Sequence, residues 1–97
     1  MIAHLVLFRL NPGIGRDDPR VREVIESMAA LPERIGTILG WEHGWNLTAD
    51  DEAWDYGLRA LFPTRDDLHA YFVHPAHQPV LDGWAGIARL AFCDFAI

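Results

Sequence analysis

The sequence predicts an α+β fold in which two helices cover one face of a four-stranded antiparallel sheet. Four segments alternate apolar and polar or small residues with the two-residue period of a β-strand. Two segments carry apolar residues at three- and four-residue steps, as amphipathic helices do. Their order along the chain is β-α-β-β-α-β. This order is that of a ferredoxin-like unit, and we expect a single domain over residues 1–97.

Residues 2–10 form the first predicted strand. Both of its faces are mostly apolar, so both are expected to be covered. One face carries His4, Val6 and Phe8. Asn11-Pro12-Gly13 then ends the strand.

The first helix is predicted from its start signal and its apolar stripe. Asp17 or Asp18 offers a capping carboxylate, and Pro19 follows at the first helical position. Leu31-Pro32 predicts the end of this helix near residue 31. The apolar stripe consists of Val21, Val24, Ile25, Met28 and Ala29.

Residues 38–46 and 53–62 are the second and third predicted strands. They are close enough in sequence to form an antiparallel hairpin. On the third strand, Tyr56 and Leu58 share a face. We expect the tryptophans of this region to lie in the core or a dimer interface, with a flat-ligand pocket as the alternative. They are Trp41, Trp45 and Trp54.

The second helix is predicted to begin after Pro63. Thr64 and Asp67 are spaced like a capping box. Pro75 cannot continue the helix, because it lacks a backbone donor and clashes with the preceding turn. We expect His74 to cap the C-terminus of this helix.

The end of the chain is predicted to hold a short helical segment and the last strand. The helical segment runs from about Ala76 to Asp82, and Gly83 and Gly86 bracket a loop. Residues 88–96 then form the fourth strand, in which Leu90, Phe92 and Asp94 alternate with their neighbours.

Composition and charge exclude several classes of partner. The chain is 51% hydrophobic with a formal charge of −6, and only eight residues are basic. A nucleic-acid surface or an anionic membrane surface would need a basic patch, so neither partner is expected. One cysteine allows no disulfide within the chain, and the N-terminus lacks the basic and apolar regions of a leader. These features predict a cytoplasmic protein.

A homodimer is predicted from the second face of the sheet. Two helices can cover only one face, and the other face carries apolar side chains. Packing sheet against sheet in a symmetric dimer would bury them. The predicted interface residues are Leu5, Leu7, Leu61 and Phe95.

Three segments together resemble a known family. They are the opening Met1-Ile2-Ala3-His4-Leu5-Val6-Leu7-Phe8-Arg9-Leu10, the helix Asp67-Leu68-His69-Ala70-Tyr71, and His74-Pro75-Ala76-His77-Gln78. In this order they resemble the stress-responsive A/B barrel (Dabb) family. The resemblance covers nearly the whole chain and implies a dimeric α+β barrel.

One member of that family is a plant polyketide cyclase that closes its substrate by an intramolecular aldol condensation. The resemblance implies that His77 would be the base and Tyr71 the residue that holds a substrate carbonyl. It places His4 in the same pocket, whereas Tyr56 stands where the cyclase has a third-strand histidine. The predicted ligand-binding residues are His4, Val6, Phe8, Tyr56, Leu58 and Phe92.

No cofactor or metal is expected. His74 and His77 would need a third ligand to hold a metal ion, and no acidic residue is fixed near them. Three functions remain open: a homodimer that binds an apolar oxygenated small molecule, a cofactor-free cyclase or lyase that uses His77 and Tyr71, and a structural stress-protective dimer with a closed core.

Overall fold

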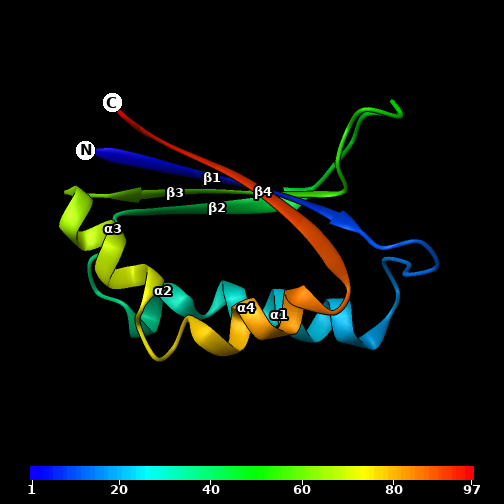
Figure 1. Cartoon of the computed structure of the whole chain (residues 1–97), viewed down its shortest axis with the longest axis horizontal. Coiled ribbons are helices and arrows are strands. Elements are labelled where there is room, and N and C mark those ends of the chain that lie inside the picture. The colour runs from blue at the N-terminus through cyan, green and yellow to red at the C-terminus, as the bar shows by residue number, and fades with distance from the viewer.

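The computed structural model describes residues 1–97 as two layers, a four-stranded sheet and a layer of helices (Figure 1). The strands are β1 (Ile2–Leu10), β2 (Gly40–Trp45), β3 (Tyr56–Phe62) and β4 (Ala88–Ala96). The helices are α1 (Pro19–Ala29), α2 (Leu31–Arg34), α3 (Arg65–Phe72) and α4 (Gln78–Ala85). The strand order is β2-β3-β1-β4, and all neighbours are antiparallel. The predicted ferredoxin-like α+β fold is confirmed.

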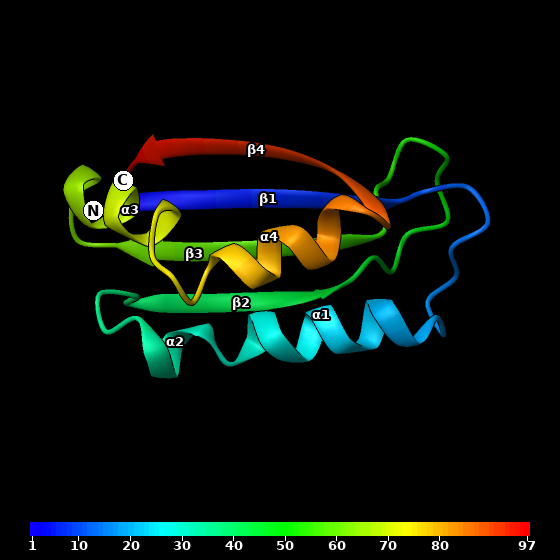
Figure 2. The same cartoon turned by 60° about the horizontal axis from the view of Figure 1, so that its bottom comes forward.

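The helices cover the sheet unevenly. Figure 2 shows α1 and α4 side by side along the sheet, with β4 at its edge. The side chains of this edge strand that face the helices remain partly exposed to solvent. Leu90 is 38% exposed and Phe92 is 67% exposed, whereas the central-strand residues Val6 and Phe8 are buried.

The first helix begins as predicted but ends differently. Asp18, and not Asp17, is the cap, and its carboxylate accepts from the backbone N–H of Arg20 at 2.9 Å. The helix ends at Ala29, and α2 then adds one further turn. Pro32 lies in the first turn of α2. Backbone N–H groups there have no hydrogen-bond partner within the helix, so the missing N–H of proline costs no hydrogen bond.

Thr64 caps the start of α3 as predicted, but Asp67 pairs with the Thr64 hydroxyl and not with its backbone N–H, so the reciprocal half of a capping box does not form. The Thr64 hydroxyl accepts from the backbone N–H of Asp67 at 3.2 Å and donates to its carboxylate at 2.8 Å. The predicted cap at the other end is wrong, because Val73 and not His74 occupies that position. The His74 ring instead accepts from the backbone N–H of Ala76 at 3.0 Å and so stabilises the turn that follows.

The predicted loop at Gly83 is also wrong, because α4 continues to Ala85 and Gly86 is its cap. Gly83 lies where α4 approaches α1 closely. A Cβ atom at Gly83 would be 2.8 Å from Cγ2 of Val24. Glycine is therefore needed here for helix packing and not for a turn.

The second and third strands are shorter than predicted, and their tryptophans lie apart. Trp41 packs against Tyr71, with ring centroids 6.1 Å apart, and Trp45 packs against Tyr56 at 4.8 Å. Both contact the hydrophobic core. Trp54 precedes β3 and lies under the guanidinium group of Arg9.

The outer face of the sheet carries the apolar residues that the sequence indicated. Leu7 on β1 and Phe95 on β4 are 49% and 43% exposed, and Leu5 and Leu61 are partly exposed. None of the helices has both the length and the apolar character that a bilayer crossing requires.

Candidate functional site

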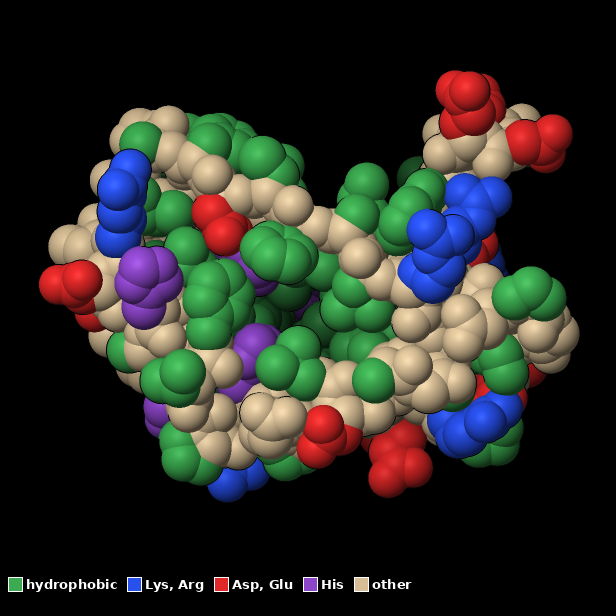
Figure 3. Space-filling view, in the orientation of Figure 1, with side chains coloured by type: hydrophobic (Ala, Val, Ile, Leu, Met, Phe, Trp, Pro, Cys, Tyr) green, Lys and Arg blue, Asp and Glu red, His purple; other side chains and the backbone are tan.

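A cavity of about 300 Å³ lies between the sheet and the helices. Its volume is near the lower end of the range for small-molecule sites. Figure 3 shows the hollow between the two layers, surrounded by apolar side chains with histidines nearby. The lining residues are His4, Val6, Phe8, Met28, Leu58, Tyr71, Phe72, His77, Val80, Leu81, Trp84, Leu90 and Phe92.

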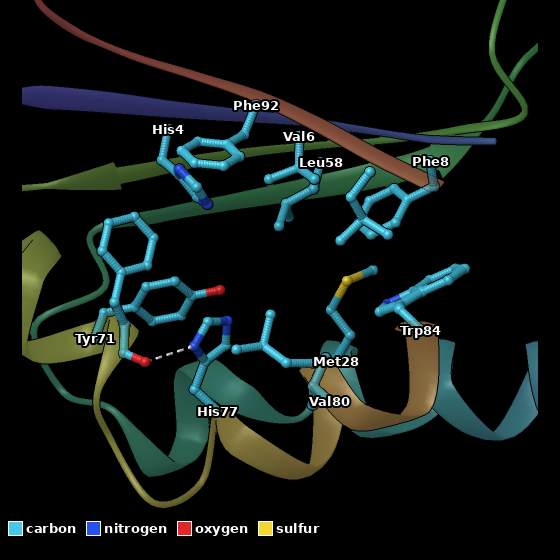
Figure 4. Close-up of a pocket in the computed structure, with 13 residues that line it drawn as sticks. His4, Val6, Phe8, Met28, Leu58, Tyr71, His77, Val80, Trp84 and Phe92 are labelled. Carbon is cyan, nitrogen blue, oxygen red and sulfur yellow. Dashed lines mark hydrogen bonds between the residues drawn. The ribbon is translucent and has the colours of Figure 1, made fainter. Parts of the chain in front are cut away.

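The polar side chains of this cavity gather around Tyr71. His4 comes from β1, Tyr71 from α3, and His77 directly precedes α4. The Tyr71 ring lies between the two histidines, with its centroid 5.8 Å from that of His4 and 4.2 Å from that of His77. Figure 4 shows all three side chains directed into the same space. The remainder of the wall is apolar.

The Asp94 carboxylate fixes the ring of His4. The two residues are direct partners in the β1–β4 register, and Nδ1 of His4 is hydrogen-bonded to Oδ1 of Asp94. His4 is buried, whereas the Asp94 side chain is 25% exposed. A carboxylate only accepts, so Nδ1 carries the proton. In the neutral ring, Nε2 of His4 then keeps its lone pair.

A backbone carbonyl fixes the ring of His77 in the same way. Its Nδ1 donates to the carbonyl oxygen of Phe72 at 3.2 Å, so Nε2 keeps its lone pair in the neutral ring. Figure 4 shows this bond and the second ring nitrogen on the cavity side. Burial lowers the pKa of His77, and the Phe72 carbonyl opposes this shift only in part. The His77 ring is therefore neutral at pH 7.

The interruption between α3 and α4 brings His77 and Tyr71 together. The helix α3 ends at Phe72, and α4 starts at Gln78 with Pro79 in its first turn. The chain between them turns back around Pro75, which cannot continue a helix. As a result, the rings of two residues six positions apart lie against each other, a contact that a continuous helix would not give.

The Tyr71 hydroxyl is a free donor at the centre of this group. It has no hydrogen-bond partner within the chain and points into the cavity in Figure 4. The ring itself is held by Phe62 and His77, with centroid distances of 5.0 and 4.2 Å. Burial raises the pKa of Tyr71 far above its ordinary value, so the hydroxyl keeps its proton.

The structure places all of the predicted site residues except Tyr56 around this cavity. Tyr56 is buried, but its side chain turns toward β2, where its hydroxyl lies 2.6 Å from Nδ1 of His43. Tyr56 therefore does not line this cavity, which differs from its predicted place in the ligand pocket. Its ring contacts two residues that do line it, Phe8 and Trp84, at centroid distances of 6.0 and 6.3 Å.

Sequence reasoning missed Asp94 and one wall of the cavity. Asp94 is the only acidic residue on the last strand, among mostly apolar residues. A lone carboxylate in such a strand could have indicated a polar partner on a neighbouring strand. Its partner could not be known without the strand register. The missed wall residues are Met28, Phe72, Val80, Leu81, Trp84 and Leu90.

The histidines do not form a metal cluster. No three His, Cys, Asp or Glu side chains lie close enough together to hold a metal ion. In the cavity, the basic nitrogens of His4 and His77 and the Tyr71 hydroxyl suit an organic oxygen function better, because they offer both lone pairs and a donor.

Fold and cavity together define a ferredoxin-like α+β domain with a pocket between its sheet and its helices. The chain belongs to the stress responsive A/B barrel domain family, whose model matches residues 2–96. An uncharacterized protein of Streptomyces coelicolor is 39% identical over 95 residues, which are 98% of each chain.

Solved structures share the fold. A dimeric ferredoxin-like protein of unknown function from Thermobifida fusca has a TM-score of 0.86 at 28% identity, covering 99% of this chain and 90% of its own. A hydroxynitrile lyase from Passiflora edulis has a TM-score of 0.85 at 13% identity, covering 99% and 92%. At that identity, the likeness to the lyase concerns the fold alone.

Proposed function

We propose that this protein is a homodimer that binds an apolar small molecule carrying a carbonyl group. One observation carries the proposal: an otherwise apolar cavity has a free Tyr71 hydroxyl between the His4 and His77 rings. A few convergent polar groups in an apolar pocket are typical of a small-molecule site, since they orient the ligand while its apolar part is buried.

Tyr71 is the group that would hold the carbonyl. Its pKa is raised by burial, so it donates a hydrogen bond and does not ionise. A carbonyl oxygen is the matching acceptor. The apolar remainder of the ligand would contact side chains such as Val6, Leu58 and Val80, which lie along the cavity beyond the histidines.

Dimerisation through the outer face of the sheet is part of this proposal. Leu7 and Phe95 are about half exposed there, on a face that no helix covers. The Thermobifida fusca relative, described as dimeric, supports a dimeric assembly. A second copy would remove this apolar surface from water.

A second candidate is cofactor-free proton transfer at the bound carbonyl. It is favoured by the fixed tautomers of His4 and His77, which keep both Nε2 lone pairs free in the neutral rings. Nε2 of one histidine would take a proton from the carbon next to the carbonyl. Tyr71 would donate to the enolate oxygen that forms. Attack of the enolate on a second carbonyl forms a carbon–carbon bond, and the imidazolium returns its proton to the new alkoxide.

Binding is tested with benzoylacetone, an apolar β-diketone. We expect saturable binding by calorimetry, and Tyr71→Phe weakens it about tenfold because one hydrogen bond is lost. The control is His69→Gln, which alters an exposed histidine on the same helix. Equal affinity of Tyr71→Phe and the wild type contradicts the proposed role of Tyr71. Absence of saturable binding favours the stress-protective dimer instead.

Proton transfer is tested with acetophenone in D₂O. If the second candidate is correct, the protein accelerates exchange of the methyl protons, followed by NMR. His77→Ala and His4→Ala are made separately, and loss of a positioned base is expected to slow exchange by about 10²-fold or more. Exchange that is unaffected by both substitutions contradicts this chemistry, and binding of benzoylacetone is judged independently.

A further inference from the structure

Trp84 places a second hydrogen-bond donor at the opposite end of the same cavity. It is 1% exposed, and its Nε1 has no hydrogen-bond partner. Buried polar groups are nearly always hydrogen-bonded, so an orphan indole N–H beside a cavity calls for an acceptor. Trp84 lines the cavity, and Figure 4 shows its indole nitrogen on the edge nearer Met28.

The two polar ends are well separated. Trp84 packs on Phe8, which is four residues from His4 along β1 and on the same face. This spacing corresponds to roughly 13 Å at about 3.3 Å per residue. Along α4, Trp84 follows His77 by seven residues, or roughly 10 Å at about 1.5 Å per residue. Apolar side chains line the cavity between the two ends.

We propose that the natural ligand is an extended molecule with oxygen functions at both ends, a carbonyl at Tyr71 and an acceptor oxygen at Trp84. This inference rests on the proposed binding function and specifies its ligand. A cavity of about 300 Å³ with polar groups toward two separated ends suits a linear chain that reaches both of them. A chain with a purely alkyl tail would leave the Trp84 donor unpaired. A chain with an acceptor oxygen at each end satisfies both donors.

In this proposal Met28 is the side chain that a ligand oxygen displaces to reach the indole nitrogen. Nε1 of Trp84 has less than 1 Å² of accessible area, so a ligand oxygen reaches it only when a neighbouring side chain moves. Met28 lines the cavity at this end. Its unbranched side chain has three rotatable bonds and adapts readily to a new neighbour.

The test uses two linear β-diketones of equal length. One has a third ketone near its far end, and the other has a methylene group at that position. In the wild type we expect the triketone to bind about fivefold to tenfold more tightly, as a single neutral hydrogen bond allows. In Trp84→Phe, which keeps an aromatic ring but lacks the N–H, we expect the two affinities to become equal. The ratio of affinities cancels any general weakening caused by the smaller ring.

A measurement on the wild type does not depend on the folding of this variant. The indole ¹H–¹⁵N signal of Trp84 is expected to move downfield with the triketone and not with the diketone. Equal affinities for the two probes, or an unchanged Trp84 signal with the triketone, overturn the inference and leave the proposed carbonyl site at Tyr71 intact. Failure of both probes to bind removes the proposed function and this inference with it.

Discussion

His4 and Asp94 face each other across β1 and β4, and their side chains are hydrogen-bonded at the edge of the cavity. The carboxylate accepts from Nδ1, so in the neutral ring the lone pair stays on Nε2 of His4, a residue that lines the cavity. A strand holds an oriented histidine more rigidly than a loop would, which is the preorganisation that acid–base chemistry needs.

Asp94→Asn is expected to let His4 populate both of its neutral tautomers. An amide can donate as well as accept, so Nδ1 no longer has to carry the proton. Long-range ¹H–¹⁵N spectra should show one neutral tautomer of His4 in the wild type and a mixture in the variant. Cys93→Ser, a neighbouring exposed position on the same strand, is the control. An unchanged His4 spectrum in Asp94→Asn would contradict the orienting role of Asp94.

The pH dependence of stability should contain a contribution from His77. Burial lowers its pKa below the ordinary value of 6.5, so below that pH the unfolded chain binds more protons at this residue than the folded chain. The free energy of unfolding therefore falls as the pH falls through about 6.5 toward the lowered pKa. Above about 6.5 both states are neutral and the contribution is constant.

Urea denaturation at several pH values measures this contribution. His77→Gln retains a donor for the Phe72 carbonyl but cannot titrate, so its stability should fall less steeply below about pH 6.5 than that of the wild type. His69→Gln removes an exposed histidine from α3 and serves as the control. The same slope in His77→Gln and the wild type would show that burial does not perturb His77.

Gly83→Ala is expected to destabilise the fold, although alanine is the better helix former. The new Cβ would lie 2.8 Å from Cγ2 of Val24. Overpacking of this kind costs about 1–3 kcal/mol, against a gain of about 1 kcal/mol in helix propensity. The difference is a net loss of up to about 2 kcal/mol in the free energy of unfolding, measured by urea denaturation.

Two further variants control this prediction. Gly86→Ala at the end of α4 adds a Cβ with nothing within 4 Å and should be close to neutral. Val24→Ala removes the colliding methyl group, so Gly83→Ala in that background should no longer destabilise. A stabilising Gly83→Ala in the native background would mean that α1 and α4 can move apart without cost.

Leu7→Lys is expected to convert the proposed dimer into a monomer. Leu7 is 49% exposed at the centre of the outer sheet face, and a charge there would be buried against the partner. Light scattering coupled to size-exclusion chromatography gives the mass directly. Val73→Lys changes an 82% exposed residue at the end of α3 and should leave the mass unchanged. A dimer that survives Leu7→Lys would place the interface elsewhere.

Local sequence signals predicted the helices and strands well where a property of neighbouring residues alone decides the backbone conformation. The alternation in residues 2–10 and 88–96 gave strands with those same bounds, because period-two burial has no helical equivalent. Pro75 predicted the break between α3 and α4 for a purely steric reason. Gly83 misled, because its role is a contact with Val24 on another helix, which glycine's intrinsic preference for turns does not reveal.

The amino-acid sequence by itself determined the order of strands and helices, the apolar outer face, and the helix break at Pro75 between Tyr71 and His77. These depend on periodicity and on the stereochemistry of neighbouring residues. Only the tertiary structure decided that Asp94 orients His4, since residues 90 positions apart meet through the register of β1 and β4. It also turned Tyr56 away toward His43 and left the Trp84 donor unpaired beside the cavity. Such outcomes depend on which elements pack together, and no local pattern encodes that.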